Sequence, residues 1–327
     1  MASRLENAAY TVGWLCTDHI NLATARAMLD EEHSRPQTLG HLDDNNYVLG
    51  KIGLHNVVIA CAPAGVRGTV SASVAATQMV SSFPKIRFGV LVGTGGGIPS
   101  DDHDIRLGDV AVSIPHRTFS GVVQFDLGKA TPSGFVRTGS LNKPPRALLN
   151  AISQVRANRE MGENQVPQYL EQLREHFDAM ADAYTYQGHA HDRLFPPDYP
   201  HSNQKSAACT KCKGVKRRSA RKDTSPVIHY GTIASSNKII EDGLQRDQLA
   251  EEFGAICVET EAAGLMDNFP CVVIRGVCNY ADAHRKGADG WHRYASATAA
   301  AFAKELLQTV HAHDVVDAPL AADIMSG

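Results

Sequence analysis

The sequence predicts an α/β protein with a mixed, largely parallel central sheet that is flanked by helices on both faces. Two observations lead to this prediction. Short apolar runs rich in β-branched residues alternate with helical patterns over both ends of the chain, and glycines bound many of these runs. Strands that are buried on both faces have this continuous apolar character. Ligands in such folds bind at the carboxyl ends of the strands, so the segments that follow each strand receive the closest attention.

The apolar runs and helical segments can be placed one after another along the chain. The expected strands are 10–15, 56–61, 87–92, 110–114, 255–258 and 271–277. Ala, Leu, Met and Glu predict a helix over 23–32, small residues fill 71–80, and the Ala-rich tail 294–310 is also helical. We therefore expect one domain over residues 1–327.

The middle of the chain differs in character from both ends. Residues 134–226 are polar and show no clear strand, although 146–186 have helical composition. Residues 188–226 are expected to form an exposed excursion, and the simplest interpretation of the basic run 211–222 is a solvated loop. The domain is thus predicted to carry a polar insertion at about 135–227.

Composition narrows the class of protein. The chain of 327 residues is 43% hydrophobic and 20% charged, and its formal net charge of −3 provides no general attraction to nucleic acid or anionic membranes. No apolar run approaches the roughly 20 residues that span a bilayer. The N-terminus lacks the layout of a signal peptide, so a cytoplasmic location is expected. The end of the chain soon after its last helix favours a free-standing protein.

The seven cysteines do not form a disulfide framework, because most stand alone in apolar segments. Cys209 and Cys212 form one close pair, with His201 upstream. A structural zinc site needs four ligands, and His189, His191 and His229 would complete one only if the fold brought them near. We expect a reduced pair, with no metal and no cofactor.

A glycine-rich segment follows the expected strand 87–92. Residues 93–97 read Gly-Thr-Gly-Gly-Gly, which lets backbone N–H groups approach a ligand while Thr94 adds a hydroxyl. A tight turn that needs positive φ explains the glycines equally well. The segment 62–69 follows the expected strand 56–61 and has similar properties. Two such segments after neighbouring strands are expected to line one pocket.

Polar groups follow the two C-terminal strands. Glu259 and Glu261 come directly after 255–258, where carboxylates complement a helix dipole or accept hydrogen bonds from sugar hydroxyls. Asn279 and Asp282 follow 271–277, where either chemistry or a turn explains them. The local pattern leaves both interpretations open.

As an ordered set, these segments resemble the nucleoside phosphorylase superfamily, most closely its fungal nucleoside phosphorylase-like branch, which is related to methylthioadenosine nucleosidase. The stretches that carry the resemblance are YTVGWLC (10–16), APAGVRGTVSA (62–72), FGVLVGTGGGIPSDDHDIRLGDVAVS (88–113), GVVQFDLGK (121–129), IHYGTIASSNKII (228–240), VETEAAG (258–264) and VIRGVCNYADAH (273–284). Members displace a base from C1′ of a nucleoside with phosphate or water. The fold that this implies agrees with the one predicted from the apolar pattern.

The resemblance also implies roles for individual residues. Glu261 corresponds to the carboxylate that binds the ribose hydroxyls, Thr260 stands where relatives usually carry methionine, and Asn279 stands where many carry an aspartate that protonates purine N7. The expected substrate-binding residues are Gly65, Thr94, Gly95, Gly96, Ser235, Ile239, Ile240, Glu259, Thr260 and Glu261. A donor at N7 helps the base to leave, while a carboxylate and a positioned nucleophile serve the sugar.

Two departures from the family pattern bear on the nucleophile. Leu91 replaces a phosphate-binding arginine of hexameric purine phosphorylases, which favours water, although Arg67 in a neighbouring turn is able to compensate. Nucleosidases orient water with an N-terminal glutamate, and Asn21 aligns there. Asp18 is the nearest carboxylate that could replace it.

The third departure is Asn279, which has three explanations. It resembles the asparagine by which trimeric phosphorylases contact O6 and N7 of 6-oxopurines, which would favour inosine and guanosine. Alternatively Asp282 supplies the acid, or an original aspartate was replaced to slow turnover. The expected catalytic residues are therefore Asn279, Asp282 and Asp18.

The expected function is a purine nucleosidase that hydrolyses inosine, guanosine or adenosine to free base and ribose. A purine nucleoside phosphorylase and a nucleoside-binding sensor module are the alternatives. The departures from the family pattern at Asn21 and Asn279 are the reason for considering a sensor. The expected partner is a purine nucleoside, with no nucleic acid and no membrane. Relatives are dimers, trimers or hexamers, which implies a homo-oligomer.

Overall fold

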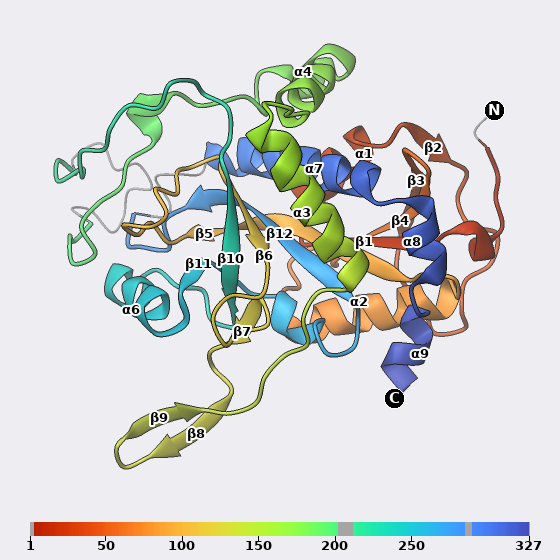
Figure 1. The fold of residues 1–327 in the computed structure, drawn as a ribbon, viewed down its shortest axis with the longest axis horizontal. Coiled ribbons are helices and arrows are strands. Elements are labelled where there is room, and N and C mark those ends of the chain that lie inside the picture. The colour runs from red at the N-terminus through yellow and green to blue at the C-terminus, as the bar shows by residue number, and fades with distance from the viewer. Residues whose placement is uncertain (1–2, 202–211, 285–289, 327) are drawn as a thin grey trace.

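The computed structural model describes residues 3–201, 212–284 and 290–326, which are built around one ten-stranded mixed sheet (Figure 1). The order is β11-β10-β6-β12-β5-β1-β4-β3-β2, and β7 pairs with β10. Its strands are β1 (Val12–Cys16), β2 (Glu31–His33), β3 (Tyr47–Ile52), β4 (His55–Cys61), β5 (Phe88–Gly97), β6 (Val110–Ser113), β7 (Val122–Gln124), β10 (Ile228–Ser235), β11 (Ala255–Glu259) and β12 (Cys271–Asn279). The central pairs β4–β1, β1–β5 and β5–β12 are parallel. The predicted fold class is confirmed.

Helices cover both faces of the sheet (Figure 1). They are α1 (His19–Ala27), α2 (Thr69–Ser82), α3 (Arg146–Glu160), α4 (Val166–His176), α5 (Asp178–Ala181), α6 (Gly243–Phe253), α7 (Trp291–Thr309), α8 (Ala312–Asp317) and α9 (Ala321–Ser326). Helix α7 packs on β12 and β5 and is itself covered by α1, α3 and α4, whereas α2 packs against β1 and β4. None of the helices in the described ranges is long and apolar enough to cross a membrane.

The apolar runs are continuous because each strand buries both of its sides. In β1, Trp14 belongs to the core under α7, and its neighbour Leu15 belongs to the core under α2. Strand β5 repeats this alternation, with Val90 on the α7 side and Leu91 on the α2 side. Successive side chains point to opposite faces, so a doubly covered strand needs apolar residues at every position.

The glycine run 93–97 is part of β5, and the prediction of a loop there is wrong. The glycines of this run do not have positive φ. They are required because β11 crosses close by, pairing Val258 with Gly96. A Cβ on Gly95 would lie 2.6 Å from Sγ of Cys257. Close packing, not a tight turn, therefore explains the glycines.

Other boundaries also differ from the predictions. The helix expected over 23–32 is α1, and it starts earlier because Asp18 caps it, accepting hydrogen bonds from the backbone N–H groups of Ile20 and Asn21. The polar middle contains one strand that its composition did not predict, β9 (Gly134–Arg137), which forms a hairpin with β8 (Gly128–Thr131). Three short 3₁₀ helices complete the fold: η1 (Asn7–Ala9), η2 (His189–His191) and η3 (Ala262–Gly264). The prediction of helices within 146–186 is confirmed by α3, α4 and α5.

The basic run 211–222 is not simply a solvated loop. The Arg218 side chain is 12% exposed and pairs with Asp192 at 2.7 Å. Arg221 is 19% exposed and forms a bidentate pair with Asp109, with both N–O distances at 2.6 Å. Charges buried to this degree need partners. Arg221 attaches the excursion to the start of β6, whereas Arg218 joins Asp192 within the excursion and also donates to the backbone carbonyl of Ile105 at 2.9 Å.

Candidate functional site

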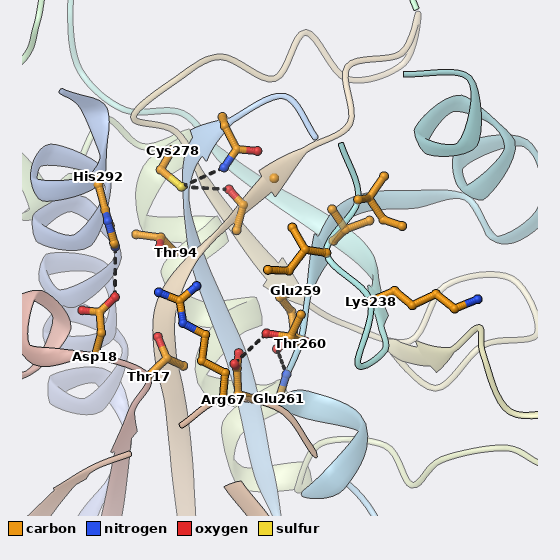
Figure 2. A pocket seen from close by; sticks show the side chains of 16 residues that line it. Thr17, Asp18, Arg67, Thr94, Lys238, Glu259, Thr260, Glu261, Cys278 and His292 are labelled. Carbon is orange, nitrogen blue, oxygen red and sulfur yellow. Dashed lines mark hydrogen bonds and ion pairs between the residues drawn. The ribbon is translucent and has the colours of Figure 1, made fainter. Parts of the chain in front are cut away.

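The predicted site residues gather around a cavity of about 180 Å³ at the carboxyl ends of β1, β5, β11 and β12 (Figure 2). Ten of the predicted residues line it: Asp18, Thr94, Gly95, Gly96, Ile239, Ile240, Glu259, Thr260, Glu261 and Asn279. Six more residues complete the lining: Thr17, Arg67, Lys238, Val258, Cys278 and His292. The parallel central strands bring these segments together because their carboxyl ends meet at one edge of the sheet.

Two glutamates from the end of β11 share one buried arginine. The Glu259 carboxylate accepts the backbone N–H groups of Glu261 and Ala262 and also pairs with Arg275. Glu261 lies 3.1 Å from Nη2 of the same arginine and accepts a 2.6 Å hydrogen bond from the Thr260 hydroxyl. The bonds of Glu259 hold the turn after β11, whereas Glu261 is the carboxylate with more capacity left for a ligand.

Arg275 belongs to β12 and is fully buried. Burial acts to lower its pKa, but the adjacent carboxylates of Glu259 and Glu261 outweigh it and raise the pKa. Two of its nitrogens, Nε and Nη1, have no hydrogen-bond partner among the described residues. The arginine thus pairs with both glutamates and fixes the orientation of Glu261.

Asn279 lies at a register shift near the end of β12, where pairing with β5 moves from Gly95 to Gly96. Its Oδ1 accepts the backbone N–H of Ala281 at 2.9 Å, and its Nδ2 lies 3.3 Å from Sγ of Cys278. Irregular pairing of this kind turns side chains out of a strand. The amide oxygen is therefore used by the backbone, and the N–H₂ group, which has two hydrogens, is the part of the side chain that can still donate to a ligand.

Asp18 and His292 lie next to each other on another wall of the cavity, with Oδ2 and Nε2 3.1 Å apart (Figure 2). Asp18 follows β1, and His292 lies in the first turn of α7. Burial acts to raise the pKa of Asp18, but the hydrogen bonds from His292 and from the backbone of α1 lower it below the usual range. The carboxylate is thus ionised at neutral pH.

Leu91 and Arg67, the two residues from which phosphate binding was judged, differ in burial. Leu91 is 1% exposed and belongs to the core under α2. Arg67 is exposed, lines the cavity and forms no ion pair with a described carboxylate. Figure 2 draws its guanidinium between Thr17 and Thr94, whereas Lys238 extends away from the other labelled side chains.

Three predicted site residues do not line this cavity. Gly65 is in an exposed turn with φ of +80°, and the same turn contributes Arg67 in its place. The Ser235 hydroxyl accepts the backbone N–H of Ala263 at 2.9 Å, which holds η3. Asp282 is 4% exposed, accepts the backbone N–H of His284 at 2.9 Å, and has a pKa that burial raises.

Asn21, which aligns with the nucleosidase glutamate, is also away from the cavity. It is 2% exposed, donates to the Thr17 hydroxyl at 3.0 Å and accepts from the Ser296 hydroxyl at 2.8 Å. Those bonds attach α1 to α7. Sequence reasoning missed His292, which lies in the first turn of α7. The signal that could have identified it as a site residue is its position at the start of a helix that follows the core strand β12.

A metal site finds no support in the described ranges, which contain no group of three or more potential ligands. Sγ of Cys212 lies 3.7 Å from Nδ1 of His201. The other cysteine of the pair, Cys209, lies outside the described residues. His201 stacks on His284 with ring planes 21° apart, so these two rings do not converge on one point.

Comparisons with known proteins agree with this arrangement. The family model of the phosphorylase superfamily matches residues 22–312. A nucleotide-binding leucine-rich repeat (NLR)-like protein of Hyaloscypha variabilis is 46% identical over 298 residues, which cover 91% of this chain. The match spans only 29% of that relative's length.

Solved structures of low sequence identity share the fold. Futalosine hydrolase of Helicobacter pylori superposes with a TM-score of 0.58 at 17% identity, covering 91% of this chain and 97% of the other. The 5′-methylthioadenosine/S-adenosylhomocysteine nucleosidase of the same organism gives a TM-score of 0.57 at 16% identity, covering 92% and 98%. Together with the family match over most of its length, these likenesses show that the chain belongs to the phosphorylase superfamily.

Proposed function

We propose that the protein is a purine nucleosidase, which hydrolyses the N-glycosidic bond of inosine, guanosine or adenosine to free base and ribose. The observation that carries the proposal is the cavity on which Glu261, held by Arg275, and the amide of Asn279 both lie. Cleavage passes through a cationic sugar and an anionic leaving base. A carboxylate on the sugar side and an N–H donor on the base side suit these two charges.

Five of the lining residues have direct roles in this proposal. Glu261 accepts hydrogen bonds from the ribose hydroxyls, Thr94 contacts the sugar from β5, and Ile239 and Ile240 flank the base. Asn279 donates to the purine at N7. Because an amide does not give up a proton, the departing base is stabilised by this hydrogen bond and takes its proton from solvent.

Water is favoured over phosphate because Leu91, where hexameric phosphorylases place an arginine, is a buried core residue. The second candidate is a purine nucleoside phosphorylase, and the observation that favours it is Arg67, an unpaired cation among the described residues that line the cavity. A nucleoside-binding sensor is the third, because a relative of this chain is described as NLR-like.

One experiment separates the three. The protein is incubated with inosine, guanosine, adenosine and uridine, with and without phosphate, and the sugar product is identified by mass spectrometry. We expect free ribose from the purine nucleosides in the absence of phosphate. Ribose 1-phosphate that forms only with phosphate identifies a phosphorylase. Saturable binding without any product identifies a sensor.

A further inference from the structure

Two titratable side chains from separate helices meet on one wall of the cavity. His292 lies in the first turn of α7, and Asp18 precedes the first turn of α1. Their side chains are 31% and 21% exposed, and Nε2 of the histidine is 3.1 Å from Oδ2 of the aspartate. The pair is thus partly enclosed and still open to the space where a ligand would lie (Figure 2).

The protein backbone fixes the aspartate of this pair. Oδ1 of Asp18 accepts the N–H groups of Ile20 and Asn21, each at 2.9 Å, so the other oxygen faces the imidazole. A carboxylate in that position favours the histidine tautomer with hydrogen on Nε2. Nδ1 is then the basic nitrogen. Nε2 lies 3.1 Å from that carboxylate but has no hydrogen-bond partner among the described residues, and catalytic contacts of this kind tighten when a ligand binds.

The other carboxylates of the described cavity lining have other roles, since Glu259 holds the turn after β11 and the proposed function assigns Glu261 to the ribose hydroxyls. Glu259 and Glu261 share Arg275, and Glu259 also holds two backbone N–H groups. Among the described residues, Arg67 on the same cavity and Arg293 of α7 are charged groups near the pair, and both are cations. Asn21, in the place of the nucleosidase glutamate, is buried against Ser296. The histidine is therefore the base that this cavity offers.

We propose that His292 is the general base that activates the attacking water, with Asp18 as its positioning residue. The inference rests on the hydrolysis proposed above. Nδ1 of His292 takes one proton of the water while its oxygen forms the bond to C1′. The C1′–N9 bond breaks, and its electron pair leaves with the purine. The base takes up a proton from solvent, the imidazolium loses one to solvent, and the charges balance.

The test measures hypoxanthine release from inosine by the full chain and its variants. His292→Gln should lower kcat by about 10²- to 10⁴-fold, the usual contribution of a general base, with KM changed less than threefold. It should also lose the acid limb of the pH profile of kcat, because no imidazole is left to be protonated. Asp18→Asn should lower kcat at least tenfold while it keeps the helix cap, since asparagine also caps helices.

His313→Gln is the matched control, because that histidine is 81% exposed in α8, and it should keep the wild-type rate. Thermal unfolding of every variant checks that it is folded, and His292→Asn replaces His292→Gln if the latter does not fold. Active wild-type protein with an unchanged kcat in the His292 variants overturns this inference alone. A rise in KM at unchanged kcat also overturns it, by showing a binding role. Wild-type protein that releases no base overturns the proposed function as well.

Discussion

Two clusters of carboxylates and arginines lie near the ends of neighbouring strands, and they differ in what surrounds them. The cavity cluster consists of Glu259, Glu261 and Arg275, and both of its glutamates line the cavity. The anchor cluster consists of Asp109, Asp192, Arg218 and Arg221, and none of these lines that cavity. The same pairing chemistry therefore lies on a cavity in one place and holds a chain segment in the other.

The anchor cluster uses up the bonding capacity of its central carboxylate. Asp109 is 1% exposed and accepts hydrogen bonds from Arg221, from Nε2 of His229 at 3.0 Å and from the backbone N–H of Val227 at 3.0 Å. Glu261 in the cavity cluster has only Arg275 and Thr260 as side-chain partners among the described residues. An incompletely bonded carboxylate on a cavity is what distinguishes the candidate site.

The largest effect is expected at Glu261. Glu261→Gln keeps the shape of the side chain but removes the charge that faces the sugar, so kcat/KM for inosine should fall by about 10²- to 10³-fold. The melting temperature should change little, because Glu259 still pairs with Arg275. Steady-state kinetics and calorimetry measure both. Glu160→Gln on an exposed position of α3 is the control, and equal losses in the two variants would contradict the distinction between the clusters.

The opposite pattern is expected for Asp109. Asp109→Asn leaves Arg221 and His229 without their carboxylate, which should cost about 3 kcal/mol of unfolding free energy, as for other broken buried pairs, while the rate per folded molecule is kept. Denaturant unfolding measures this cost. The exposed Asp198→Asn is the control.

The stability difference at Asp109 should depend on pH. Burial acts to raise the pKa of Asp109, but Arg221 and His229 outweigh it and lower the pKa. A carboxyl group with a lowered pKa in the folded state stabilises above its unfolded pKa of about 3.9 and loses that stabilisation as the pH falls through the folded value. The gap between wild type and Asp109→Asn should shrink on acidification. A constant gap from pH 7 to pH 3 would show that charge is not its cause.

A smaller effect is expected at Gly95, in the part of β5 that lies against β11. Gly95→Ala places a Cβ 2.6 Å from Sγ of Cys257, and overpacking of this kind costs about 1–3 kcal/mol. The double variant Gly95→Ala with Cys257→Ala removes the sulfur and should recover part of the loss in a double-mutant cycle. Additive effects of the two changes would show that this contact does not set the requirement for glycine.

The smallest effect is expected at Asn279. The next residue, Tyr280, contacts the anchor cluster instead. Asn279→Asp offers an acid to N7 and should raise the rate on adenosine several-fold, about 1 kcal/mol in barrier. Tyr280→Phe removes the hydroxyl that contacts Arg218 and Asp192, so it should lower the melting temperature and leave the ratio of adenosine to inosine rates unchanged. An unchanged adenosine rate in Asn279→Asp would remove this residue from the handling of N7.

Sequence reasoning predicted strands and cavity residues correctly where burial produces a continuous apolar run or where a residue belongs to a family motif. The strands 56–61 and 110–114 were placed almost to the residue, because continuous apolar runs follow from burial on both faces. Thr94, Glu261 and Asn279 were placed through motifs, and they do meet at one cavity. The reasoning failed at 93–97, because the partner that demands glycine there, β11, lies far along the chain.

The sequence by itself determined the fold class, the family and most of the residues that line the cavity. Only the tertiary structure decided which charges pair. It joins Glu261 to Arg275, Asp18 to His292, and the arginines of the excursion to Asp109 and Asp192. The physical reason is that the burial of a strand or helix determines the pattern of apolar residues along that segment, and this pattern is visible in the sequence. A charge pair depends on two segments that the fold brings within a few ångströms, and nothing local records it.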